Sequence, residues 1–232
     1  MNFGELKTKV SEYLNRSDLD SHISDWIHIA QRDVERGQFT IEGRTIAVNW
    51  NCMKSRQTVD SDEMYITMPV RIKEVCWMKI LHNGRYYPLD GIAPDLALSL
   101  YPYPESANGR PKLFSFLEEQ NEIMVRPTPD QSYHYEMELY AYSAELSKDA
   151  DENWWTKNAW EILLYGALIQ AEAFMVNDSR MTTWKTMYDL TVSKLASTER
   201  SARFASSQFV IQSYLPIQLR SGGSDFNFEA GE

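Results

Sequence analysis

The chain has 232 residues and a formal net charge of −10, and 43% of its residues are hydrophobic and 12% aromatic. This size and aromatic content support a packed core and exclude a disordered chain. The acidic balance argues against a protein that grips nucleic acid over its whole surface, because phosphate binding depends on lysine and arginine. No apolar stretch approaches ~20 residues and no secretory signal opens the chain, so neither a membrane span nor export is predicted.

The first predicted unit is a helix pair within residues 2–38. Phe3, Leu6 and Val10 share one face of the first helix. Ile23 and Trp26 begin a second amphipathic pattern, and Gly37 is a plausible stop for it. Asn15 to Asp20 separates the two helices with polar residues. The N-terminus is therefore predicted to be one of two helix pairs.

The β region is predicted over about residues 43–142. Asn83-Gly84 lies between two apolar runs and is a strong hairpin signal. A short helix is predicted at 94–100, because proline suits the first helical turn, and a second hairpin is predicted within 112–126. Residues 133–142 alternate apolar and polar side chains, as a half-buried strand does. We expect a small antiparallel sheet of five or six strands.

The second helix pair is predicted over residues 150–204 as a helical hairpin that turns at 176–179. Asp149 and Glu152 have capping-box spacing and are expected to begin it. Gly166 is expected to let a neighbouring helix approach closely. Five apolar residues at helical spacing are expected to form the packing of the hairpin. They are Trp160, Leu164, Leu168, Trp184 and Tyr188.

Residues 205–232 lose the helical period and are predicted to form an extended C-terminal arm. The segment has too little apolar surface to fold alone. Its apolar residues are nevertheless costly to leave in water, so it either seeks a partner or lies back on its own domain as an edge strand. The residues expected to carry its contacts are Phe209, Ile211, Tyr214, Leu215 and Leu219.

No catalytic, cofactor-binding or metal-binding residues are predicted. His22 and His28 are neighbours in the sequence but lack metal-ligand spacing, and Cys52 and Cys76 form no redox or metal motif. Acidic clusters at 60–63 and 118–122 fall in turn-like segments and are interpreted as solvated surface. The arginines nearest to a basic patch are interleaved with acidic residues. The cysteine usage predicts a reduced, cytoplasmic setting.

These patterns predict an α+β fold: a helical bundle of two helix pairs, a central small antiparallel β-sheet insertion and an extended C-terminal arm. Residues 1–204 are predicted to form a single domain.

Several short motifs, in order, resemble one family of virus proteins. They are the opening Met1 to Leu6, Tyr13 to Leu19, Ile23 to Ile27, Tyr65 to Pro69, Gly109 to Pro111, Val125 to Pro129, Asn153 to Trp155, and Leu163 to Leu168. Together they resemble the head-to-tail adaptor (connector) proteins of tailed, chiefly short-tailed, bacteriophages. The resemblance covers roughly residues 1 to 200. Met68 departs from the leucine that is commoner in the family, and the tail does not align.

The resemblance implies a structural virion protein rather than an enzyme. Such adaptors form a homo-oligomeric ring, usually of twelve subunits, between the portal protein of the capsid and a tail or nozzle protein. DNA passes through the channel without sequence-specific binding, and no membrane is involved. The expected location is the virion neck, after synthesis in the host cytoplasm. The family often uses its C-terminal segment on the portal, which is why the five arm residues are expected to make that contact.

Two other classes stay open. One is another neck or tail component, such as a gatekeeper or tail-tube protein. The other is a hydrolase that uses paired carboxylates, which two carboxylates converging in a pocket would favour.

Overall fold

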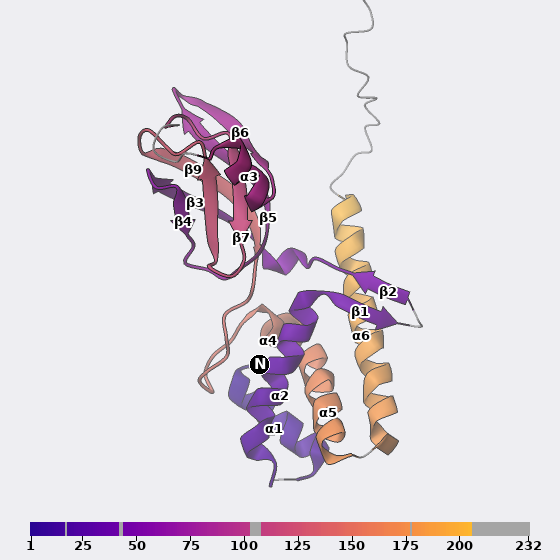
Figure 1. Cartoon of the computed structure of the whole chain (residues 1–232). Helices are drawn as coiled ribbons and strands as arrows, with labels where there is room; N and C mark the ends of the chain where they lie inside the picture. Colours follow the sequence, from indigo (N-terminus) through magenta and orange to yellow (C-terminus); the bar gives the residue numbers. More distant parts are fainter. Residues whose placement is uncertain (17, 42–43, 103–107, 177, 206–232) are drawn as a thin grey trace, which may run out of the picture.

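The computed structural model describes residues 1–232 except 17, 42–43, 103–107, 177 and 206–232. The described residues form a helical lobe and a sheet lobe, which Figure 1 shows one above the other. Each lobe encloses its own hydrophobic core. The expected α+β class is confirmed, with six α-helices among the described residues. The predicted arm falls beyond Ala205, outside the described residues.

The N-terminal helix pair forms as the sequence predicts. Helix α1 (Phe3–Leu14) begins at Asn2, whose side chain accepts a hydrogen bond from the backbone N–H of Glu5, while the Glu5 carboxylate accepts one from the N–H of Asn2. This reciprocal capping box satisfies two backbone donors at the helix start. Helix α2 (Asp20–Arg36) ends at Gly37, where φ is +70°. Glycine reaches this left-handed conformation without a steric cost.

The C-terminal helices differ from the prediction at their start. Asp149 and Glu152 do not open a helix; instead Asn153 caps α4 (Trp154–Asn158) in a capping box with Thr156. The segment before it is engaged elsewhere, because the carbonyl of Asp149 accepts a hydrogen bond from the N–H of Gly4. Ala159, with φ −147°, separates α4 from α5 (Trp160–Met175). A long helix, α6 (Asp178–Ala205), follows.

Helix α5 lies at the centre of the helical lobe, between α2 and α6 (Figure 1). Gly166 on α5 faces Ala30 on α2, and a Cβ atom placed at Gly166 would lie 2.7 Å from the Cβ of Ala30. The expectation that this glycine allows a close helix approach is confirmed. Of the five hairpin residues, Leu164 and Leu168 are fully buried. Trp160, Trp184 and Tyr188 are half-buried and pack against the same core.

A two-stranded ribbon follows α2 and lies beside α6 (Figure 1). It consists of β1 (Gln38–Ile41) and β2 (Arg44–Ala47). The rings of Phe39 and Tyr188 are 6.4 Å apart, and the Glu199 carboxylate accepts a hydrogen bond from the N–H of Asn51 at 3.0 Å. Asn51 lies in a short 3-10 helix, η1 (Asn51–Met53), which leads into the sheet lobe.

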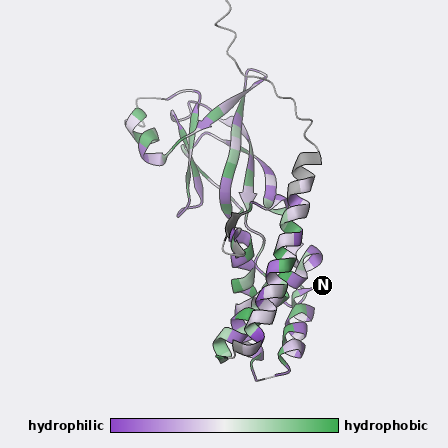
Figure 2. Cartoon of the chain, turned by 90° about the vertical axis from the view of Figure 1, so that its right-hand side faces the viewer, coloured by the Kyte–Doolittle hydropathy of each residue, from purple (hydrophilic) through white to green (hydrophobic). Residues whose placement is uncertain are grey.

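The main sheet has seven strands rather than the expected five or six. The strands are β3 (Lys54–Ser61), β4 (Tyr65–Thr67), β5 (Ile72–His82), β6 (Arg85–Gly91), β7 (Leu113–Leu117), β8 (Glu122–Arg126) and β9 (Tyr133–Ala141). Their order is β3-β9-β5-β6-β7-β8-β4, and the sheet is nearly closed on itself. Bands of hydrophobic and hydrophilic residues alternate along the strands in Figure 2, so one face lines the core of the lobe.

The prediction of a wholly antiparallel sheet is wrong at one place. Strands β6 and β7 pair in parallel, with Asp90 opposite Leu113 and Gly91 opposite Phe114. A parallel pair requires a crossover connection, and the chain between these strands contains α3 (Pro94–Leu100). The local signals were correct: Asn83-Gly84 turns β5 into β6 with both residues at positive φ, and β9 alternates buried and half-buried side chains.

Candidate functional site

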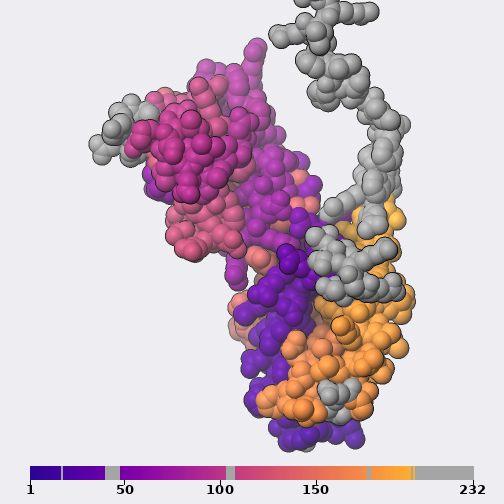
Figure 3. Space-filling view, turned by 45° about the vertical axis from the view of Figure 1, so that its right-hand side comes forward, coloured from indigo at the N-terminus to yellow at the C-terminus, as the bar shows by residue number. Residues whose placement is uncertain are grey.

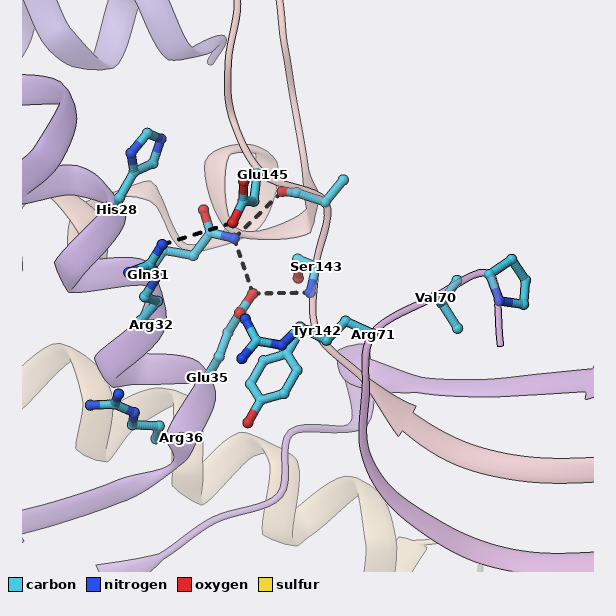
Figure 4. Close-up of a pocket in the computed structure, with 12 residues that line it drawn as sticks. His28, Gln31, Arg32, Glu35, Arg36, Val70, Arg71, Tyr142, Ser143 and Glu145 are labelled. Atoms are coloured by element: carbon cyan, nitrogen blue, oxygen red, sulfur yellow. Dashed lines mark hydrogen bonds and ion pairs between the residues drawn. The ribbon is translucent and has the colours of Figure 1, made fainter. Parts of the chain in front are cut away.

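The two lobes meet at a cavity of about 420 Å³ (Figure 4). One wall is the C-terminal half of α2, and the other consists of residues 69–71 and 142–145 from the sheet lobe. Residues 142–145 begin the connection from β9 to α4. The cavity therefore lies where the orientation of the lobes is set.

Glu35 is the central residue of this junction. It comes from α2, is only 3% exposed, and one of its carboxylate oxygens, Oε1, accepts three hydrogen bonds. The donors are the indole Nε1 of Trp155 at 2.9 Å, the backbone N–H of Ser143 at 3.2 Å and the side-chain amide of Gln31 at 3.2 Å. Burial raises the pKa of the Glu35 carboxyl, and these hydrogen bonds act in the opposite direction. One side chain thus ties α2, the inter-lobe connection and α4 together.

Asn153 and His28 extend this network along the connection. The Asn153 amide donates to the Gln31 side chain and to the carbonyl of Ala144, each at 3.3 Å. The Nε2 atom of His28 lies 2.7 Å from the carbonyl of Leu146. Residues 143–153 are therefore held against α2 at several points by polar contacts.

The C-terminal end of α2 receives further donors. Lys73, on β5, donates to the carbonyls of Glu35 at 2.8 Å and Arg36 at 3.0 Å. The indole of Trp50 donates to the carbonyl of Val34 at 2.6 Å. The last carbonyls of a helix lack the usual intrahelical donor, although that of Val34 also accepts the N–H of Gly37 at 3.1 Å. A cation at this end also interacts favourably with the helix dipole. A lysine of the sheet lobe thus completes a helix of the other lobe.

Three arginines at the rim of the cavity are each engaged. Arg32 lies 3.8 Å from the Glu145 carboxylate, and Arg36 lies 3.6 Å from that of Asp33. The guanidinium of Arg71 stands over the Tyr142 ring at 5.1 Å. The Oε1 atom of the buried Glu35 carboxylate already accepts three hydrogen bonds from the protein. This arrangement is suited to holding the two lobes together.

Of the histidines, cysteines and acidic clusters singled out in the sequence, only His28 lies at this cavity. Asp60 pairs with His134 at 2.7 Å on the edge of the sheet, and Glu122 accepts a hydrogen bond from Thr67. His22 lies against the rings of Trp26 and Phe174. Within the described part of the chain, no three histidine, cysteine, aspartate or glutamate side chains form a group that could hold a metal ion.

Sequence reasoning missed Glu35, Gln31 and Asn153. A signal for the first two existed: Gln31 and Glu35 follow Ile27 at intervals of four, so they continue a buried stripe of α2. A polar pair on such a stripe needs buried partners, but their identity depends on residues more than a hundred positions away. The five arm residues, Phe209 to Leu219, lie outside the described residues.

The described residues thus form two lobes joined by a buried polar network. A family model described as SU10 adaptor protein matches residues 1–210. The chain therefore belongs to the SU10 adaptor protein family, a structural family named for a short-tailed phage. A search of curated proteins found no match. No helix among the described residues is long and apolar enough to cross a membrane.

Proposed function

We propose that this chain is a neck protein of a phage virion that forms a ring between the portal and the tail. The observation that carries the proposal is the family match, which takes in both lobes and extends into the residues after α6. The ring is expected to contain twelve copies. Its other neighbour is a tail or nozzle protein.

The fold is suited to this mechanical role. A subunit that lies between the portal and the tail must keep its two lobes in a fixed relative position. The Glu35 junction fixes the lobes relative to each other through buried hydrogen bonds, which cost free energy when they are broken and left unmade. The two cores let each lobe present a different surface to a different partner.

The charge of the chain suits a DNA channel. A formal charge of −10 on each copy gives a ring a strongly negative field. If acidic surface lines the channel, phosphates are repelled, and DNA slides through rather than binding. We expect no sequence-specific contact with DNA.

The arm supplies the contact with the portal. Helix α6 ends at Ala205, and the residues that follow include Phe209, Ile211, Tyr214, Leu215 and Leu219. Apolar side chains of this kind gain free energy when a partner covers them, at roughly 25 cal/mol per Å².

The arm is tested by a truncated chain that ends at residue 205, mixed with portal rings of the same virus. We expect it to fold as the full chain does by circular dichroism and to fail to co-sediment with the portal. A full-length chain with serine at the five apolar positions tests the same contact without shortening the chain, and it should also fail to co-sediment with the portal. Co-sedimentation of both variants at wild-type level would contradict the arm's role.

A further inference from the structure

The outer face of α6 has almost no charge, although the protein as a whole is acidic. Six residues follow one another along it at alternating intervals of three and four. They are Thr183, Met187, Leu190, Lys194, Ser197 and Ser201, here called the α6 stripe, and all are exposed. The opposite face of α6 carries Tyr188, Val192 and Leu195, which pack on the helical core. The stripe is therefore a continuous surface that the described residues of the chain leave uncovered.

The α6 stripe has almost no charge. Lys194 is its one charged residue, and the exposed residues of α6 among those described include no acidic side chain. Met187 and Leu190 are 42% and 49% exposed, in the middle of the stripe. In a chain of charge −10, a face without carboxylates is where another copy can approach without repulsion.

Several hydroxyl groups of this region already have a partner within the helix. Thr186 donates to the carbonyl of Thr182, Ser197 to that of Lys194, and Ser201 to that of Ser197. A hydroxyl that has a partner in its own helix does not need water. Covering this face therefore leaves the Ser197 and Ser201 hydroxyls paired, which lowers the usual cost of burying polar groups.

A second exposed face, with an isoleucine between charged residues, lies on α2, on the other side of α5 (Figure 1). The exposed residues His22, Asp25, Ile29, Arg32 and Arg36 recur at the same spacing and are here called the α2 stripe. Ile29 is 39% exposed, and Asp25 and Asp33 lie four residues to either side of it. Lys194 likewise lies four residues from Leu190, so one helix direction brings its ammonium near Asp25 and the other near Asp33, which in its own chain lies 3.6 Å from Arg36. In Figure 3, the orange surface of α5 and α6 and the purple surface that includes α2 occupy different flanks of the helical lobe.

We propose that the α6 stripe binds the α2 stripe of a second copy of this chain, and that this contact joins neighbours in the ring. The inference rests on the proposed function. Two different faces in contact make a head-to-tail interface, which generates a ring when the rotation closes. An α6–α6 contact is disfavoured because each stripe brings a lysine and no carboxylate.

The size of the contact predicts how it forms. The stripe runs over 19 residues, from Thr183 to Ser201, and its 18 steps along the helix cover ~27 Å; a helix is ~10 Å wide. It therefore offers on the order of 300 Å², well below the ~800 Å² that each partner contributes to a standard stable interface. We expect copies to remain apart in dilute solution and to associate where the portal gathers them.

The first test measures assembly of full-length variants on portal rings of the same virus by mass photometry. Met187→Asp/Leu190→Asp should keep the wild-type circular dichroism spectrum, because both side chains are exposed, and should fail to complete a ring. Leu96→Asp/Leu100→Asp is the matched control. These two leucines on α3 are 51% and 57% exposed but lie on the sheet lobe, and this variant should assemble as the wild type does.

The second test is cross-linking in a Cys76→Ser background, which removes the exposed native thiol. The remaining Cys52 is poorly reactive, because burial raises the pKa of its thiol to about 12. Leu190→Cys and Ile29→Cys in one chain should give a ladder of disulfide-linked multimers on the portal, and neither substitution alone should give a ladder.

The outcomes separate the two proposals. If wild-type chain builds a ring while the α6 aspartate variant also builds it and the cysteine pair gives no ladder, the interface is wrong and the ring stands. If wild-type chain adds no copies to the portal, the ring itself is wrong, and the interface with it.

Discussion

Replacing Glu35 tests whether the inter-lobe junction stabilises the fold through its hydrogen bonds. Glu35→Leu removes the acceptor of the Trp155 indole and of the Ser143 backbone N–H. Each buried donor left unpaired costs about 1–3 kcal/mol, so we expect a loss of about 3 kcal/mol. Glu35→Gln has nearly the same shape and keeps one oxygen as acceptor. It should lose less than about 1 kcal/mol, because removing the buried charge offsets the weaker hydrogen bonds.

The raised pKa of Glu35 predicts in which direction its contribution to the free energy of unfolding changes with pH. Burial raises the pKa of Glu35 in the folded state above its ordinary value in the unfolded chain. Between the two pKa values the folded state binds more protons than the unfolded state, so the contribution of Glu35 to stability falls as pH rises through that interval. The free energy of unfolding of wild-type protein should therefore decline relative to Glu35→Gln as pH rises above about 4.3, the ordinary pKa of glutamate.

The assay is urea denaturation followed by far-ultraviolet circular dichroism, at several pH values from about 4 to about 8, with wild-type, Gln and Leu variants in parallel. Equal stability of the Gln and Leu variants would refute the role of the hydrogen bonds. A difference between wild type and the Gln variant that does not change with pH would refute the raised pKa.

Three further substitutions follow from local geometry. Gly166→Ala places a methyl group 2.7 Å from the Cβ of Ala30, so we expect the free energy of unfolding, measured by urea denaturation, to fall by about 1–2 kcal/mol. Adding Ala30→Gly should recover part of this loss, and strictly additive effects of the two substitutions would contradict the steric explanation. Val176 holds φ +54°, which a β-branched residue rarely adopts, so Val176→Asn should raise the free energy of unfolding by about 1 kcal/mol, and a lower urea midpoint would count against that strain. Lys73→Met removes the donor to two α2 carbonyls and should cost about 1 kcal/mol in the same measurement; an unchanged midpoint would show that the contact contributes nothing.

The sequence predicted elements whose cause is local. Gly37 ends α2, and Asn83-Gly84 turns β5 into β6, because each position needs a left-handed backbone that its residue tolerates. The alternation of β9 was visible because a strand turns every second side chain toward the core.

What the sequence could not show depends on distant partners. The parallel pairing of β6 with β7 is decided by how the crossover around α3 folds. The start of α4 was misplaced because Asn153 competes with Asp149 as a cap, and the backbone of Asp149 is already used by Gly4. The Glu35 junction brings together three segments of the chain, and no single segment contains its pattern.

The proposed ring is best tested by the native mass of the full chain, measured with and without portal rings. Alone, the protein should have the mass of one 27.0 kDa chain. With portal rings from the same virus, the complex should gain a fixed number of chains, expected to be twelve. A complex that gains no chains, or gains them without reaching a fixed number, would show that this protein is not a ring-forming adaptor.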